Sequence, residues 1–191
     1  MTIHVNRVLN MKQIKVIGFD MDHTLVKYHS DVFENLTFEK SIIKLLELNY
    51  PEAIKKFKFD FNKAIRGLVV DKENGNILKV SLYNKIKNSY HGTRKLSHKE
   101  QRKTYKGSSI DIGDPSYLSV DTNFSIAFTI LFGELVKLKD LNAELELPSY
   151  AEMADDVLHA VDMAHRDGSL KEEVQANLDK YIIKDEGIVK A

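Results

Sequence analysis

The chain has 191 residues, 43% of them hydrophobic, which fits a globular protein with a proper core. Lys plus Arg and Asp plus Glu number 28 each, so a formal net charge of +0 predicts no overall attraction to nucleic acid or to an anionic membrane. Cysteine is absent, which excludes disulfides and thiolate sites. No stretch reaches the ~18 consecutive apolar residues of a membrane span and no apolar leader is visible, so we expect a cytoplasmic protein.

The first predicted element is a short strand over residues 14–19, an apolar run rich in β-branched side chains. This composition favours a central strand that is covered on both faces of a parallel sheet. Ligands of open α/β sheets bind outside the carboxyl ends of the strands, which is where Asp20 stands. Asp22 follows two residues later, and a turn directly after Asp20 could bring both carboxylates to one site. Such a pair favours a bound cation or unequal pKa values; the alternative is that Asp20 only caps the next turn or helix, as Thr24 could.

The next elements are a helix and a hairpin. Residues 36–48 have apolar side chains at mostly helical spacing, and Pro51 ends or restarts the helix. Residues 66–83 contain two β-branched-rich runs around Asn74 and Gly75, which predict a β-hairpin.

The second half of the chain begins with a polar segment and continues with helices. Residues 90–114 are polar and basic with three glycines, which predicts a mobile surface excursion with solvated basic side chains. Residues 125–138 are apolar on all sides, typical of a buried helix. Residues 150–166 carry one apolar stripe and predict an amphipathic helix that stops at Gly168.

Longer stretches resemble a known family. The segment FDMDHT matches the Asp-x-Asp-x-Thr motif of the haloacid dehalogenase (HAD) phosphatases. Together with RGLVVDKENGNILKV and AVDMAHRDGSLKEEVQANLDKYIIKD, it is similar to the cytosolic purine 5′-nucleotidase II family of that superfamily. The resemblance implies an α/β fold with a Rossmann-type core and an inserted α+β cap. Residues 1–60 would be the first part of the core, 61–165 the cap region and 166–191 the return toward the core.

The resemblance also implies a chemistry for the motif. Asp20 resembles the nucleophile that becomes an aspartyl phosphate, and Asp22 the general acid and base. Both would hold Mg²⁺, Asp20 through its carboxylate and Asp22 through its main-chain carbonyl, so that the metal offsets the repulsion between carboxylate and phosphate. Thr24 would steady the loop, and His23 would be a bystander beside the site. The implied substrates are IMP and GMP.

Contacts with the purine are implied for a further set of side chains: Phe124, as a stacking ring, and Asp162, His165 and Lys171. Asp162 and His165 are three residues apart and share one helical face, so they can converge. Without the resemblance, an ordinary solvated face on which these two side chains pair is the favoured interpretation. Leu158 stands where the family commonly has an arginine, which puts one substrate or effector contact in doubt.

Later HAD motifs are not found in the sequence: an apolar strand ending in Thr or Ser, a phosphate-binding lysine and a second acid pair. Two hypotheses follow. The chain is the amino-terminal part of a Mg²⁺-dependent purine 5′-nucleotidase, or it is a non-catalytic nucleotide-binding or interaction module of the same family. We expect a purine nucleoside monophosphate as ligand, neither nucleic acid nor a membrane as partner, and, by family resemblance, a homo-oligomer.

Overall fold

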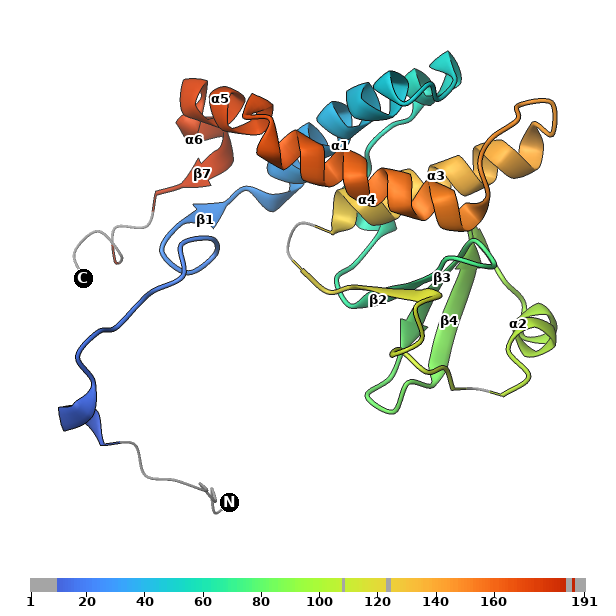
Figure 1. Cartoon of the computed structure of the whole chain (residues 1–191), viewed down its shortest axis with the longest axis horizontal. Coiled ribbons are helices and arrows are strands. Elements are labelled where there is room, and N and C mark those ends of the chain that lie inside the picture. Colours follow the sequence, from blue (N-terminus) through green and yellow to red (C-terminus); the bar gives the residue numbers. More distant parts are fainter. Residues whose placement is uncertain (1–9, 108, 123–124, 185–186, 188–191) are drawn as a thin grey trace.

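The computed structural model describes residues 10–107, 109–122, 125–184 and 187. Figure 1 shows long helices lying over a small sheet, with α5 and α6 at the opposite end of the molecule from α2. The fold is mixed α/β, as predicted. In the described part of the chain, no helix is long and apolar enough to cross a membrane.

Three helices form the upper layer: α1 (Ser30–Glu47), α3 (Ile126–Leu141) and α4 (Tyr150–Arg166). All three were expected, although α1 begins earlier than its apolar pattern does. They pack together because each presents apolar side chains to one shared core. The predicted stripe of α4 is fully buried or nearly so, and consists of Met153, Val157, Val161 and Ala164.

The lower layer is a five-stranded sheet in the order β5-β4-β3-β2-β6. All of its strand pairs are antiparallel. One face packs against α3, which carries the core across the two layers. The strands are β2 (Leu68–Asp71), β3 (Asn76–Val80), β4 (Ile86–His91), β5 (Arg94–Lys95) and β6 (Tyr117–Val120).

The predicted hairpin is confirmed in β2 and β3, whose register pairs Asp71 with Asn76. Gly75 has a φ of 65°, a left-handed conformation that suits glycine. The carboxylate of Asp71 accepts the backbone N–H groups of Glu73 and Asn74 at 3.2 and 3.1 Å and so holds the turn. Local turn chemistry therefore brings the two strands together.

The basic segment contains regular structure that was not predicted. It includes the end of β4, β5 and the short helix α2 (His98–Thr104). Ser97 and Glu100 form a capping box at the start of α2. The spacing Ser-x-x-Glu was visible in the sequence, but the polar composition around it hid the signal.

The prediction of a paired strand over residues 14–19 is wrong for the described structure, which gives this segment no sheet partner. The short 3-10 helix η1 (Met11–Gln13) precedes it, and the run itself is exposed: Val16 is 84% and Phe19 71% accessible. A central strand needs a neighbour on each side, and no described strand lies beside this run.

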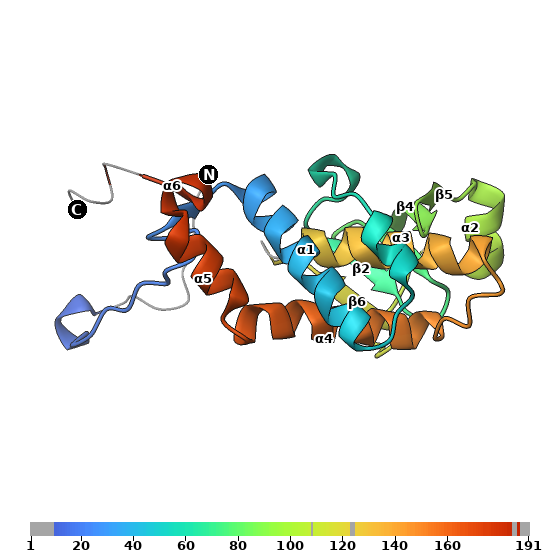
Figure 2. The same ribbon diagram turned by 90° about the horizontal axis from the view of Figure 1, so that it is seen from above.

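A second, two-stranded sheet joins the two ends of the described chain. Strand β1 (Lys27–Tyr28) pairs antiparallel with β7 (Ile182–Ile183), next to α5 (Ser169–Ala176) and α6 (Leu178–Tyr181). Figure 2 shows α5 and α6 beside the amino-terminal end of α1. The residues that follow Asp20 and lead into β1 therefore lie close to β7. Two further 3-10 helices, η2 (Glu52–Lys56) and η3 (Phe61–Lys63), link α1 to β2.

Candidate active site

A tight turn follows Asp20 directly, the arrangement that could bring the two motif carboxylates to one site. The carbonyl of Met21 accepts the N–H groups of Leu25 and Val26, both at 2.9 Å, and the N–H of His23 donates to the Val26 carbonyl at 2.7 Å. His23 has a φ of 59°, in the left-handed region, which lets the chain reverse within a few residues. This turn, residues 21–26, is the motif loop.

The two motif carboxylates have different surroundings. Asp20 is exposed and has no side-chain hydrogen bond within the described residues. Asp22 is half-buried, and its Oδ1 accepts the hydroxyl of Tyr28 at 2.6 Å. Burial and this hydrogen bond raise the pKa of Tyr28 to about 12, so the phenol stays a neutral donor at physiological pH. Tyr28 thus orients Asp22 through one oxygen and leaves Oδ2 available.

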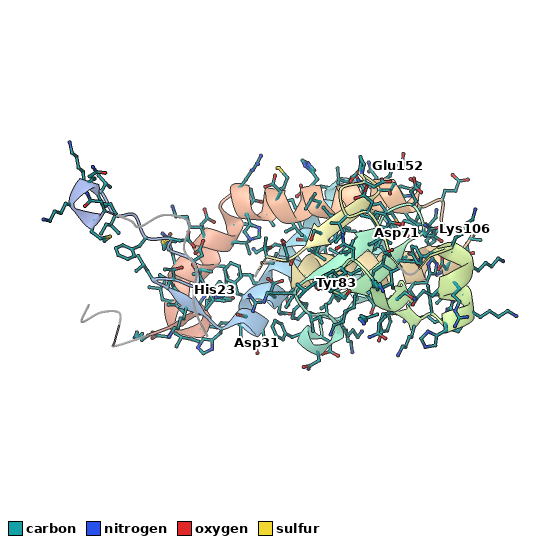
Figure 3. The ribbon with its side chains drawn as sticks, turned by 90° about the horizontal axis from the view of Figure 1, so that it is seen from below. His23, Asp31, Asp71, Tyr83, Lys106 and Glu152 are labelled. Carbon is teal, nitrogen blue, oxygen red and sulfur yellow. The ribbon has the colours of Figure 1, made fainter. Side chains whose placement is uncertain are left out.

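The other two residues of the motif take smaller parts. Thr24 is exposed and contributes its backbone N–H to the Met21 carbonyl at 3.4 Å. The ring of His23 lies 5.3 Å from that of Tyr28. His23 therefore packs beside the Tyr28–Asp22 pair, and Figure 3 labels it at the opposite end of the molecule from Lys106.

A row of rings connects the motif loop to the end of α4. The ring centroid of Tyr28 lies 5.2 Å from that of Phe33, which lies 6.3 Å from that of His165. Phe33 belongs to the first turn of α1 and is 9% exposed. The rings of Tyr28 and Phe33 therefore connect Asp22 to His165, although these two residues are far apart in the sequence.

A pocket of about 340 Å³ opens at the same end of α4. Asp162 and His165 both line it, as their shared helical face predicted. Strand β6 and the start of α3 supply the opposite wall, which includes Val120 and Phe128. A cavity of this size with apolar walls and a few polar side chains is typical of a small-molecule pocket.

Asp162 and His165 do not pair with each other. The Arg166 guanidinium lies 3.1 Å from Asp162 Oδ1, and His165 Nδ1 lies 2.8 Å from the Val161 carbonyl. That carbonyl can only accept, so Nδ1 carries the proton. The simple interpretation of these residues as an ion pair is therefore wrong.

The remaining predicted contacts are spread around this pocket. Leu158 lines it and is 45% exposed, so no arginine reaches in from that position. Lys171 is exposed on α5, beyond the break at Gly168, and is not part of the pocket wall. Phe124 lies outside the described residues, and the structure does not test its predicted role.

A buried acid on α1 contacts the start of α3, which forms part of the pocket wall. Glu34 on α1 is 1% exposed, and its Oε2 accepts the backbone N–H of Ala127, in the first turn of α3, at 2.6 Å. Its Oε1 has no hydrogen-bond partner among the described residues. Burial raises the pKa of Glu34 to about 7, although the Ala127 hydrogen bond opposes the shift. Glu34 therefore ties the start of α3 to the helix that carries Phe33.

The side chains that could hold a metal ion at this site are the two acids of the motif, Asp20 and Asp22. In the described ranges, no group of three or more His, Cys, Asp or Glu side chains could hold a metal ion. Mg²⁺ usually keeps several waters and binds one or two carboxylates together with a substrate phosphate. Asp20 is exposed and Asp22 keeps its Oδ2 available, so the two acids of the motif fit that requirement for protein ligands.

Sequence reasoning missed Tyr28 and Phe33. Both lie between the motif and the helical pattern of residues 36–48, in a stretch for which the sequence predicts no functional role. Their roles depend on the approach of α4 to α1, which no local pattern predicts. The signal that existed was two aromatic residues following an acidic pair.

The tilted rings of Tyr28 and Phe33 connect the loop that carries Asp22 to the pocket lined by Asp162 and His165, and this part of the molecule is the candidate site. The chain belongs to the 5′-nucleotidase family, whose pattern matches residues 3–191.

Individual proteins with similar sequences are also named as 5′-nucleotidase domain-containing proteins. A 5′-nucleotidase domain-containing protein of Dictyostelium discoideum is 30% identical over 188 residues, covering 95% of this chain and 31% of that protein. The human 5′-nucleotidase domain-containing protein 2 is 24% identical over 193 residues, covering 95% of this chain and 37% of its own length. The rat protein of the same name is also 24% identical. The chain spans about a third of the length of these curated relatives.

Proposed function

We propose that the whole protein is a Mg²⁺-dependent 5′-nucleotidase of the HAD superfamily, and that it hydrolyses the purine nucleoside monophosphates IMP and GMP. Membership of the 5′-nucleotidase family supports phosphate-ester hydrolysis. The observation that carries the assignment of the site is the row of rings from Tyr28 to His165. This row supports the proposal because it links the loop that carries Asp22 to the pocket beside α4, and a nucleotide needs contacts for both its phosphate and its base. The cytoplasmic location expected from the sequence remains part of this proposal.

Asp20 is the nucleophile in this proposal. Its carboxylate is exposed and is not engaged by a hydrogen bond in the described part of the chain, so an oxygen is free to attack phosphorus. The new bond joins a carboxylate oxygen to phosphorus, and the bond to the ribose 5′-oxygen breaks. The result is an aspartyl phosphate, which water then hydrolyses to regenerate Asp20.

Asp22 moves the protons in both steps. It protonates the leaving 5′-oxygen and then, as a carboxylate, removes a proton from the attacking water. The Tyr28 hydroxyl at Oδ1 fixes the side chain and leaves Oδ2 to carry the proton. Mg²⁺ bound by Asp20 and Asp22 would supply positive charge to offset repulsion between the carboxylate and the phosphate.

The purine occupies the pocket beside β6. Asp162 and His165 line this pocket and supply polar side chains near the edge of the base, while Val120 and Phe128 provide apolar walls. We keep Phe124 as the stacking ring and Lys171 as a further contact. The aromatic packing of His165 on Phe33 fixes the imidazole against the motif end of the molecule.

The test is phosphate release by the whole protein from IMP, GMP and a pyrimidine nucleotide, with Mg²⁺ and with EDTA. We expect release from the purine nucleotides with Mg²⁺ only. Brief reaction with ³²P-labelled IMP followed by acid quench should leave label on wild-type protein and none on the Asp20→Asn variant. Turnover in that variant would rule out the aspartyl-phosphate mechanism.

The chain of 191 residues alone should release no phosphate above background, because a HAD site requires a phosphate-binding lysine and a second acid pair. We also expect it to self-associate through the exposed run at residues 14–19. Light scattering beside the phosphate assay checks both expectations. Nucleotide binding without turnover by the whole protein would favour the alternative of a non-catalytic module.

A further inference from the structure

The turn between β3 and β4 presents two large apolar side chains to solvent. Leu82 is 98% and Tyr83 83% exposed. The Asn84 N–H donates to the Ser81 carbonyl at 2.9 Å, so Leu82 and Tyr83 are the two central residues of a β-turn. Such positions usually hold Gly, Pro, Asn, Asp or Ser. Neither turn chemistry nor core packing explains this pair.

The turn is well braced. The hydroxyl of Ser81 accepts the backbone N–H groups of Tyr83 and Lys85, both at 3.3 Å, and the Ser81 N–H donates to the Lys85 carbonyl at 2.9 Å. The Asn84 carbonyl accepts the Ile110 N–H at 3.0 Å, which ties the turn to a neighbouring segment. Leu82 and Tyr83 are therefore held outward by a fixed backbone.

The surroundings of the turn are strongly basic. Residues 79–107 contain nine lysines and arginines and one glutamate, a net charge of +8 in a chain whose total is +0. Within the described structure, only Arg94 of these nine forms an ion pair, with Glu100 at 2.9 Å. The positive charge on both sides of the turn is thus available to a partner. Lys79, Lys85 and Lys87 all belong to the hairpin itself.

The shape of this region limits the kind of partner. Figure 1 shows the β3–β4 loop projecting from the end of the sheet that lies farthest from α1 and α4, and Figure 3 labels Tyr83 on the face seen from below. A projecting tip with two apolar side chains offers little area for a protein interface of standard size. A bilayer interface accepts such a tip, because tyrosine and leucine enter the headgroup region while lysines contact anionic lipid.

We propose that the Leu82–Tyr83 turn is a docking site for an anionic membrane surface, a peripheral contact that does not depend on the proposed catalysis. The turn side chains insert at the interface, and Lys79, Lys85 and Lys87 bind the headgroups. The chain as a whole has a net charge of zero because the acidic residues that balance this basic region lie in other parts of the sequence. Residues 140–156 hold six acidic residues and no lysine or arginine.

The acidic region provides a matched control. Leu141, at the end of α3, is 72% exposed, but its sequence neighbours include Asp140, Glu144 and Glu146. If simple apolar exposure caused vesicle binding, Leu141 would contribute as much as Leu82. If the combination with positive charge is required, only the Leu82–Tyr83 turn contributes.

The experiment is co-sedimentation of the purified chain, and of the whole protein, with vesicles of phosphatidylcholine alone or mixed with phosphatidylserine. We expect binding to the mixed vesicles only, weakened by salt. The L82S/Y83S variant should bind at least about tenfold less, K85E/K87E should also lose binding, and L141S should bind like wild type. Circular dichroism should report an unchanged fold for all variants, since every altered side chain is exposed.

Three outcomes overturn the proposal: no binding to mixed vesicles, equal binding to both vesicle types, or equal loss in L141S and L82S/Y83S. Light scattering without lipid tests whether a second copy of the chain, and not a membrane, binds to the turn. If wild-type chain self-associates and L82S/Y83S alone becomes monomeric, the turn is an interface between copies and not a membrane contact.

Discussion

Two apolar runs of similar composition have opposite fates in this molecule. Residues 14–19 and strand β2 (Leu68–Asp71) are both short, rich in β-branched residues and predicted as strands. Strand β2 is fully buried between β3 and β6, whereas Val16 in the first run is 84% exposed. The difference lies in the partner. Strand β2 meets β3 through a four-residue loop, while residues 14–19 have no neighbour in the described chain.

The two regions have different roles, one in the proposed chemistry and the other in the stability of the fold. The exposed run leads into the acids of the motif, while the paired strands and the helices above them hold the core. Variants at the motif should therefore change turnover without changing the unfolding transition, and variants in the paired region should do the reverse.

The largest expected effect is that of Asp20→Asn in the whole protein. Loss of the nucleophile should lower kcat by at least about 10⁴-fold. The melting temperature should stay within error, because Asp20 is exposed and has no side-chain hydrogen bond among the described residues. Steady-state kinetics and differential scanning calorimetry on one preparation measure both quantities. A large drop in melting temperature would mean that Asp20 has a structural role as well.

Asp22→Asn should lower kcat by about 10²–10⁴-fold, since it removes proton transfer but not the nucleophile. Slow accumulation of phosphoenzyme should remain detectable. Tyr28→Phe is the matched control: it deletes only the hydroxyl at 2.6 Å from Asp22 Oδ1 and keeps the ring against Phe33. We expect it to shift the pH profile with a smaller loss. A wild-type pH profile in Asp22→Asn would contradict the assignment of Asp22.

Much of the fold could be predicted because its signals are local. The hairpin turn at Asn74-Gly75 and the apolar periodicity of α4 each act within a few residues. The candidate site was harder. The sequence identified Asp20 and Asp22. The contact of Phe33 with His165, however, depends on the packing of α1 against α4, two helices that are far apart in the sequence. Strand pairing of residues 14–19 failed for the same reason, since β-propensity does not supply a partner.

Glu34, which links α1 to the start of α3, should make the free energy of unfolding depend on pH. Its folded-state pKa is about 7, above its ordinary value of 4.5, so the folded protein binds more protons than the unfolded chain between these pH values. The stabilising contribution is therefore complete below pH 4.5 and is lost as pH rises through about 7. The loss should reach about 3 kcal/mol in the free energy of unfolding.

Glu34→Gln is the control for that prediction. A glutamine oxygen can still accept the Ala127 N–H, but the side chain does not titrate. Urea unfolding of wild type and variant at several pH values should show a pH-dependent difference that is absent below pH 4.5 and grows toward neutrality. Parallel pH curves for the two proteins would show that Glu34 does not carry the effect.

The smallest expected effect compares two glycines that both have positive φ. At Gly75 (φ 65°) a Cβ would lie 3.0 Å from the ring of Tyr150, whereas at Gly67 (φ 77°) it would meet nothing within 4 Å. Gly67→Ala should therefore cost only backbone strain, about 1 kcal/mol. Gly75→Ala should cost at least about 1 kcal/mol more, because the turn and the start of α4 must move apart. The difference between the two free energies of unfolding isolates the contact between hairpin and helix. Equal costs would mean that Tyr150 yields freely, and that the hairpin is held by its own turn and strands and not by the helical layer.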